Sequence, residues 1–206
     1  RNLSAVFSKI EEPLIPIISE MEKTGILVNK VLLEQTKKEI QKRLAEIEKA
    51  VTEHVGKSIN LNSPKQLSEL LFGSLGLKPK GKKKESGAFT TNAEALETLK
   101  DEHPVIPLIL EHRELQKILS SYLESLLEHI GQDGRIHAKF FQHGTTTGRF
   151  SSADPNLQTI PASGTWGRLV RRAFIAKPGS VFISCDYSQI ELRVLAMLSG
   201  DEKLVA

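Results

Sequence analysis

Apolar side chains recur at steps of three and four through the first two thirds of the chain, which predicts a helical region. Residues 31–55 carry one apolar stripe and precede Gly56, so we expect a long amphipathic helix there. A second long helix is predicted over residues 105–130, and a shorter one over residues 11–23 that ends at Thr24-Gly25. The stripe of the first long helix consists of Ile40, Leu44, Ile47, Val51 and Val55.

Two shorter helices are indicated by their capping residues. Asn62 or Ser63 before Pro64 makes a good N-cap and first-turn pair, and Asn92 precedes the other helix. Between them, residues 78–87 (KPKGKKKESG) form a low-complexity stretch that we expect to be a flexible basic loop. The loop has two readings, a solubilising segment without a specific partner or a contact with the backbone of a nucleic acid.

The pattern changes after the turn signal Gln132-Asp133-Gly134. Residues 135–142 alternate between polar and apolar as a strand does, and residues 181–185 form a short apolar run typical of a second strand. From residue 188 the spacing returns to that of a helix, which Gly200 ends. The sequence therefore predicts an α+β protein, with a long-helix region over residues 11–132 and the start of an antiparallel sheet domain over 133–206.

The composition is that of an ordinary folded protein. Of the 206 residues 39% are hydrophobic and 26% charged, and no apolar run approaches the ~20 residues of a membrane helix. The single cysteine, Cys185, excludes an internal disulfide and a cysteine-rich zinc site and fits a reducing cytoplasm. Because the chain starts at Arg1 without an initiator Met, we expect residues 1–10 to be a linker from an absent upstream domain.

Positive charge is concentrated in the last third of the chain. Residues 135–200 hold eight Lys or Arg against the three acids Asp154, Asp186 and Glu191. A surplus of this kind is typical of phosphate-binding surfaces, although a solvated basic face has the same composition.

The segment at 181–193 (VFISCDYSQIELR) has a pattern that suits metal chemistry. An apolar strand would deliver the carboxylate of Asp186 at its end, with Glu191 and Arg193 on the helix that follows. Hard divalent cations need oxygen ligands held rigidly, and a strand end is such a mount. Taken alone, an Asp after a strand is also the usual N-cap of the next helix.

Residues 145–161 (TTTGRFSSADPNLQTIP) are too polar to build a core. Arg149, Asn156 and Gln158 carry side chains that reach the minor-groove acceptors common to all base pairs, so the segment can sense a duplex without reading its sequence. The alternative is a polar surface loop capped by Asp154-Pro155.

These segments resemble the palm of the bacterial DNA polymerase I family, family A. The stretch DYSQIELR at 186–193 is similar to the first catalytic motif of the family, and TGRFSSADPNLQTIP at 147–161 to its template–primer motif. Three further stretches look like the thumb and the connection between the palm motifs: INLNSPKQL at 59–67, EHRELQKILSSY at 111–122 and GRLVRRAFIA at 167–176.

The resemblance implies roles in nucleotidyl transfer for four residues. Asp186 would bind two catalytic Mg²⁺ ions, with the backbone carbonyl of Tyr187 completing one coordination shell. Glu191 would be a catalytic-site residue beneath the incoming sugar, where it disfavours a 2′-hydroxyl, and Gln189 would lie near the nucleotide. The partners implied are primer–template DNA and deoxynucleoside triphosphates.

The resemblance also implies contacts with the duplex. Arg149, Asn156 and Gln158 would contact the template–primer near the primer end, and Arg113 and Lys117 would touch the duplex backbone. Two departures from the family pattern stand in the same motif, Thr159 for the usual Asn and Phe150 for the usual Leu. Trp166 receives no role beyond packing.

The family pattern further implies an incomplete polymerase domain. Residues 11–132 would be the thumb and 133–206 the N-terminal part of the palm, without the fingers and the second catalytic aspartate. We expect such a chain to be inactive alone, to need the C-terminal fingers and palm remainder, and to work at the nucleoid in a bacterial cytoplasm. The other hypotheses are a non-enzymatic duplex-binding module and a helical interaction protein.

Overall fold

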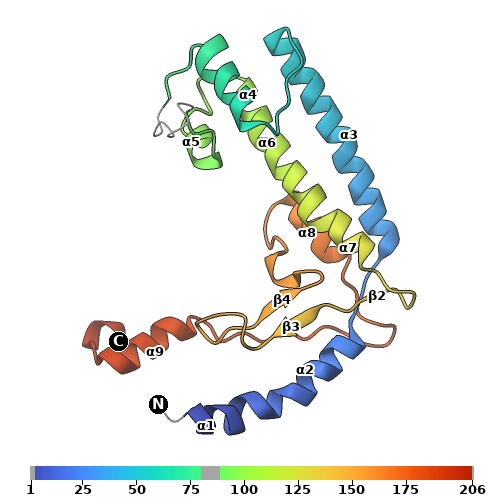
Figure 1. Cartoon of the computed structure of the whole chain (residues 1–206), viewed down its shortest axis with the longest axis vertical. Coiled ribbons are helices and arrows are strands. Elements are labelled where there is room, and N and C mark those ends of the chain that lie inside the picture. Colours follow the sequence, from blue (N-terminus) through green and yellow to red (C-terminus); the bar gives the residue numbers. More distant parts are fainter. Residues whose placement is uncertain (1–2, 80–88, 206) are drawn as a thin grey trace. The chain divides into compact units, whose positions relative to one another are not determined.

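The computed structural model describes residues 3–79 and 89–205 (Figure 1). The chain divides between Ile175 and Ala176 into two compact units, each of which is described by itself. The first unit contains nearly all of the hydrophobic core, and the second consists of a short extended segment and two helices.

Two long helical segments, α3 (Lys30–Val55) and α6 (Val105–Ile118), pack side by side in the first unit (Figure 1). Asn29 begins α3, because its side-chain oxygen accepts a hydrogen bond from the Leu32 amide at 3.0 Å. Gly56 ends it in the left-handed conformation. The predicted apolar stripe faces α6, and its fully buried members are Ile40, Ile47 and Val51.

The second predicted long helix is divided into three parts. After α6 come a π-helical segment, η3 (Leu119–Glu124), and α7 (Ser125–Glu128). The Ser120 hydroxyl donates to the Gln116 carbonyl at 2.8 Å and competes with the α-helical backbone bond at the start of the wider turn. The prediction of a helical segment is therefore confirmed, but the prediction of one regular α-helix to residue 130 was wrong, because the segment contains a π-helical part and ends at Glu128.

The N-terminal helical segment is longer than the pattern predicted. Helix α2 (Glu12–Thr24) follows α1 (Leu3–Val6) and the π-helical η1 (Phe7–Glu11), and Gly25 ends it at a φ of 58°. The interpretation of residues 1–10 as a linker stays a prediction.

The two capped helices predicted near the basic loop are present. Ser63 caps α4 (Pro64–Ser68), which continues into η2 (Glu69–Ser74), and Asn92 caps α5 (Ala93–Glu97). Of the predicted flexible loop at 78–87, residues 80–87 lie outside the described residues.

Two small antiparallel sheets replace the single strand predicted over residues 135–142. Strand β1 (Ile26–Leu27) pairs with β2 (Arg135–Ile136), and β3 (Lys139–Phe141) pairs with β4 (Ser151–Ala153). The strand is interrupted at His137 and Ala138, where the His137 ring turns to the Glu22 carbonyl. The 3₁₀ turn η4 (Leu157–Thr159) and helix α8 (Thr165–Arg172) follow β4.

The strand predicted over residues 181–185, in the second unit, is not formed among the described residues. Residues 181–185 are extended, but no other described segment pairs with them, so they form no strand. Val181 and Ile183 are 81% and 84% exposed, because a strand acquires its hydrogen bonds and buried face only from a neighbour. Helices α9 (Ile190–Ser199) and α10 (Glu202–Val205) complete the unit, and Gly200 ends α9 as predicted.

The described part of the protein is mostly helical, with small antiparallel sheets. Of the antiparallel sheet domain whose start was predicted over residues 133–206, the described residues form only two-stranded antiparallel sheets. Among these same residues, no helix combines the length and the apolar character needed to cross a bilayer.

Candidate nucleic-acid and nucleotide site

The polar segment at 147–161 is held in shape by its own side chains. Asn156 Oδ1 accepts hydrogen bonds from Ser152 Oγ and from the Gln158 amide, both at 3.0 Å, and so caps η4. Gln158 Nε2 donates to the Phe150 carbonyl at 3.0 Å. The structure thus brings Asn156 and Gln158 together, and the cap residue is Asn156 rather than the predicted Asp154.

These internal bonds leave donors available to a duplex. An Asn or Gln amide nitrogen has two N–H groups, and the bonds above use none on Asn156 and one on Gln158. Minor-groove N3 and O2 atoms are acceptors, so N–H groups are the right complement. Arg149 is exposed on the same segment, and its carbonyl accepts from the Thr145 hydroxyl at 2.8 Å.

The β3–β4 hairpin positions this segment against the N-terminal helices. Gln142 Nε2 donates to Glu11 Oε2 at 2.6 Å, and the Phe140 amide donates to Glu22 Oε1 at 2.7 Å. An ion pair joins Lys139 and Asp154 at 3.3 Å across the hairpin. The polar loop is therefore mounted on α2 and η1 rather than hanging from the chain.

Arg113 and Lys117 lie one helical turn apart on α6 but in different surroundings. Lys117 is exposed, whereas Arg113 is half-buried and donates to the backbone carbonyl and the Oγ1 of Thr91. Burial lowers the pKa of the Arg113 guanidinium from its usual value. The link from Arg113 to Thr91 was not predicted, because nothing local connects residues 22 positions apart.

Arg113 also lies in a polar hollow at the ends of two short helices. The hollow has a volume of about 380 Å³, and its walls come from the neighbours of the α4 cap, from the α5 cap and the two residues before it, and from α6. Its lining residues are Asn62, Pro64, Thr90, Thr91, Asn92 and Arg113.

In the second unit, the residues of the predicted catalytic motif are all exposed. Gln189 precedes α9 with a left-handed φ of 53°, and Arg193 Nε donates to the Ser188 carbonyl at 3.0 Å, which holds the turn. Asp186 does not cap α9, so its alternative reading as an N-cap is not what the structure shows. Glu191 lies in the first turn of that helix, five residues after Asp186.

The donor set of this unit fits part of a magnesium site. Carboxylate and carbonyl oxygens are the ligands Mg²⁺ prefers, and Asp186 and Tyr187 offer one of each in consecutive positions. Among the described residues, no group of three or more His, Cys, Asp or Glu gathers to hold a metal. Asp186 therefore offers one carboxylate of the kind that a magnesium site uses.

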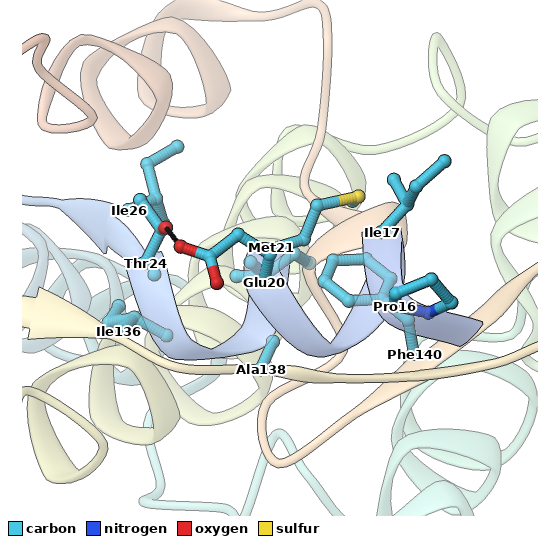
Figure 2. Close-up of a pocket in the computed structure, with 11 residues that line it drawn as sticks. Pro16, Ile17, Glu20, Met21, Thr24, Ile26, Ile136, Ala138 and Phe140 are labelled. Atoms are coloured by element: carbon cyan, nitrogen blue, oxygen red, sulfur yellow. Dashed lines mark hydrogen bonds between the residues drawn. The ribbon is translucent and has the colours of Figure 1, made fainter. Parts of the chain in front are cut away.

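The first unit also contains an apolar hollow of about 700 Å³ that the sequence pattern did not predict. Figure 2 shows Ile17 and Met21 on α2, with Ile136 on β2 and Ala138 on the connection between β2 and β3. Ile17 and Met21 line this hollow and are 54% and 49% exposed. Large apolar residues of an amphipathic helix normally face a core, so their exposure is the sequence signal that could have indicated the hollow. None of the predicted site residues lines this hollow.

Comparison with known proteins places these features in a family. The model of DNA polymerase family A matches residues 30–206. DNA polymerase I of Caldicellulosiruptor bescii is 47% identical over 202 residues, which cover 98% of this chain and 24% of that protein. Thermostable DNA polymerase I of Thermus aquaticus is 43% identical over 201 residues, with 97% and 24% covered.

A solved structure agrees with the sequence relatives. The POL domain of Pol1 from M. smegmatis, in complex with DNA primer-template and dNTP, matches with a TM-score of 0.86 and 40% identity. The match covers 96% of this chain and 35% of that chain. The chain spans about a quarter of the length of the curated relatives it matches. It belongs to DNA polymerase family A.

Proposed function

We propose that the chain forms the thumb and the N-terminal part of the palm of a DNA polymerase that extends a primer on a template. The observation that carries the proposal is the family match over residues 30–206, which includes both motif segments. The thumb would be residues 11–132 and the palm portion 133–206, with residues 1–10 as the linker. The work would take place at the bacterial nucleoid.

The first unit would bind the primer–template duplex. Arg149, Asn156 and Gln158 would reach minor-groove acceptors from the segment that the hairpin holds on α2. Lys117, exposed on α6, would contact a backbone phosphate. Arg113 would contact the backbone as well, while its bonds to Thr91 support the wall of the polar hollow.

The second unit would take part in the chemistry. Magnesium ions, when bound, stabilise the attacking and leaving oxygens of an in-line phosphoryl displacement. Asp186 and the Tyr187 carbonyl would hold them from this chain. Glu191 would lie beneath the sugar of the incoming deoxynucleoside triphosphate and disfavour a 2′-hydroxyl, with Gln189 beside it.

A single carboxylate and one carbonyl do not complete the coordination shells of two ions, so the remaining ligands and the groups that grip the triphosphate would come from the fingers and the palm remainder of the polymerase. The similar solved structure, which contains primer-template and dNTP, extends well beyond the matched region. We therefore expect the 206-residue chain alone to extend no primer.

A chimera tests the proposal. The chain would replace the matching quarter of the C. bescii enzyme, to which it is 47% identical, and primer extension would be followed with Mg²⁺ present. The chimera should extend a primer, whereas Asp186→Asn in it should abolish extension and leave duplex affinity within about twofold. Asp201→Asn on the α9–α10 connection is the matched control.

Two results would overturn the proposal. Extension by the Asp186→Asn chimera at the parent rate would exclude the metal-ligand role. Duplex binding by a chimera that never extends a primer would favour the second candidate, a duplex-binding module without catalysis, which the exposed and unclustered Asp186 also permits.

A further inference from the structure

Helix α8 presents three arginines on one exposed face. Gly167 and Val170 turn inward and are buried, and Trp166 packs beside them against the core. The residues that alternate with them, Arg168, Arg171 and Arg172, are all exposed. Positions three and four apart on a helix are neighbours, so the three guanidinium groups share one surface.

This surface lacks an acidic complement. Among the described residues, no Asp or Glu forms an ion pair with any of the three arginines. The carboxylate of Glu114 approaches Gly164, the residue before α8, without pairing with them. Like charges on adjacent turns destabilise a helix by a few tenths of a kcal/mol, about the size of a surface pair.

Helix electrostatics explain only part of the pattern. Arg171 and Arg172 lie in the last turn, where cations interact favourably with the carbonyl end of the helix. Arg168 lies one turn earlier, beyond the reach of that effect. A partner that carries several negative charges accounts for all three.

The surface is also fixed to the segment proposed to bind the duplex. A β-carbon added at Gly167 would lie 2.8 Å from Pro161 Cβ, so α8 packs closely on the residue that ends the 147–161 segment. Val170 is fully buried in the core, which prevents the helix from rotating. The buried face of α8 is thus fixed to the end of the 147–161 segment, and the three arginines lie on its other, exposed face.

We propose that Arg168, Arg171 and Arg172 form an additional contact surface for the phosphodiester backbone of a nucleic acid. The proposal rests on the proposed function as a duplex-binding polymerase segment. Guanidinium groups bind phosphate oxygens through paired N–H donors, and a run of three on one helix face matches a strand with a phosphate at each nucleotide. The contact adds affinity without sequence preference.

The salt dependence of binding tests the proposal. A labelled primer–template duplex would be titrated with the 206-residue chain by fluorescence anisotropy at a series of KCl concentrations. The slope of log K against log [salt] is negative, and each lost phosphate contact reduces its magnitude by about 0.9. R168Q/R171Q/R172Q should therefore reduce the magnitude of the slope by about 2 to 3. The variant R168K/R171K/R172K should keep the slope, because it keeps the charges.

A matched control removes three charges elsewhere. Lys38, Lys42 and Lys49 are exposed on α3, and K38Q/K42Q/K49Q changes the net charge by the same amount. This variant should keep the parent slope. An equal fall in both triple variants would show that net charge, not the α8 surface, sets the salt dependence, and would overturn the proposal.

The remaining outcomes separate the two proposals. If the parent chain binds the duplex and R168Q/R171Q/R172Q keeps its slope, the α8 surface fails while the duplex-binding function stands. If the parent itself shows no salt-dependent binding, both fail. A parallel titration with a deoxynucleoside triphosphate separates sources of phosphate, since weaker triphosphate binding with an unchanged duplex slope would assign the arginines to the nucleotide and overturn the backbone proposal.

Discussion

His137 joins two elements that are distant in the sequence, because its Nε2 lies 3.0 Å from Asp133 Oδ2 while its Nδ1 lies 2.8 Å from the Glu22 carbonyl. Both ring nitrogens face acceptors, and only the imidazolium can donate to both. The contact fastens the end of α2 to the turn before β2. Arg135 reinforces it by donating to the Thr24 and Gly25 carbonyls, each at 3.2 Å.

We predict that this contact makes stability depend on pH. The bond to Glu22 and the Asp133 carboxylate raise the pKa of His137, and bonds from Arg135 and His137 lower the pKa of Asp133. The His137 contribution is complete below its unfolded value of 6.5 and is lost as pH rises through the folded pKa. The Asp133 contribution is complete above its unfolded value of 3.8 and is lost as pH falls through the folded pKa.

The melting temperature between pH 3 and 9 measures this effect. Stability from the pair should be greatest between the two unfolded pKa values, about 4 to 6.5. His137→Gln should remove the loss of stability above pH 6.5. His54→Gln, on an exposed ring whose Nδ1 lies 2.8 Å from the Ala50 carbonyl of its own helix, should leave that loss unchanged. An unchanged profile in His137→Gln would contradict the assignment.

Gly25 should tolerate no side chain. Its φ is 58°, and a β-carbon there would lie 2.7 Å from His137 Nδ1 and 2.8 Å from the Ile136 carbonyl. Gly25→Ala should therefore cost about 2–4 kcal/mol, the sum of left-handed strain and a displaced contact. Gly56→Ala has a similar φ of 75° with open space around it, and should cost only about 1 kcal/mol. Urea unfolding measures the free energy of unfolding of both variants. Equal losses would show that the His137 ring can move away from a β-carbon at residue 25 without cost.

The sequence predicted what is decided locally. The burial of Ile40, Ile47 and Val51 follows from their spacing, and the caps at Ser63 and Asn92 follow from side chains that bond within three residues. In each case the residues that predict the feature and the residues that form it belong to the same short segment of the chain.

What could not be predicted depends on distant partners. Residues 181–185 are apolar enough for a strand, but a strand needs a neighbour that no local pattern specifies. The interruption of the predicted strand at His137 depends on the bond of its ring to the Glu22 carbonyl. The half-buried position of the Arg113 side chain depends on its bond to the Thr91 carbonyl. For the candidate site, the sequence located Asn156 and Gln158 correctly on one loop but could not show that they bond within it. Their roles toward DNA stay predictions.

An ion pair between Arg43 and Glu111 should stabilise the packing of the two long helices. Arg43 on α3 donates from Nε and Nη2 to the two carboxylate oxygens of Glu111 on α6, at 2.7 and 2.8 Å. Because both side chains are more than a third exposed, we expect a coupling of about 0.5–1 kcal/mol between Arg43→Ala and Glu111→Ala. A double-mutant cycle by urea unfolding measures it. The exposed pair of Lys49 and Glu53, at 4.0 Å, should give a coupling near zero.

Arg113 combines a structural bond with a proposed phosphate contact, and two substitutions separate these roles. Arg113→Lys keeps the charge but loses the forked donors to Thr91, so stability should fall by about 1–2 kcal/mol with the salt slope of duplex binding unchanged. Arg113→Gln should show the same loss of stability and also lower the slope by about 0.9. Lys117→Gln, one turn along the helix and exposed, should reduce the magnitude of the slope without loss of stability.

Anisotropy titrations over a range of salt measure the slope, and urea unfolding measures the stability. If Arg113→Gln left the slope at the parent value, Arg113 would act only by holding Thr91 in place, and of these two α6 residues only Lys117 would contact phosphate.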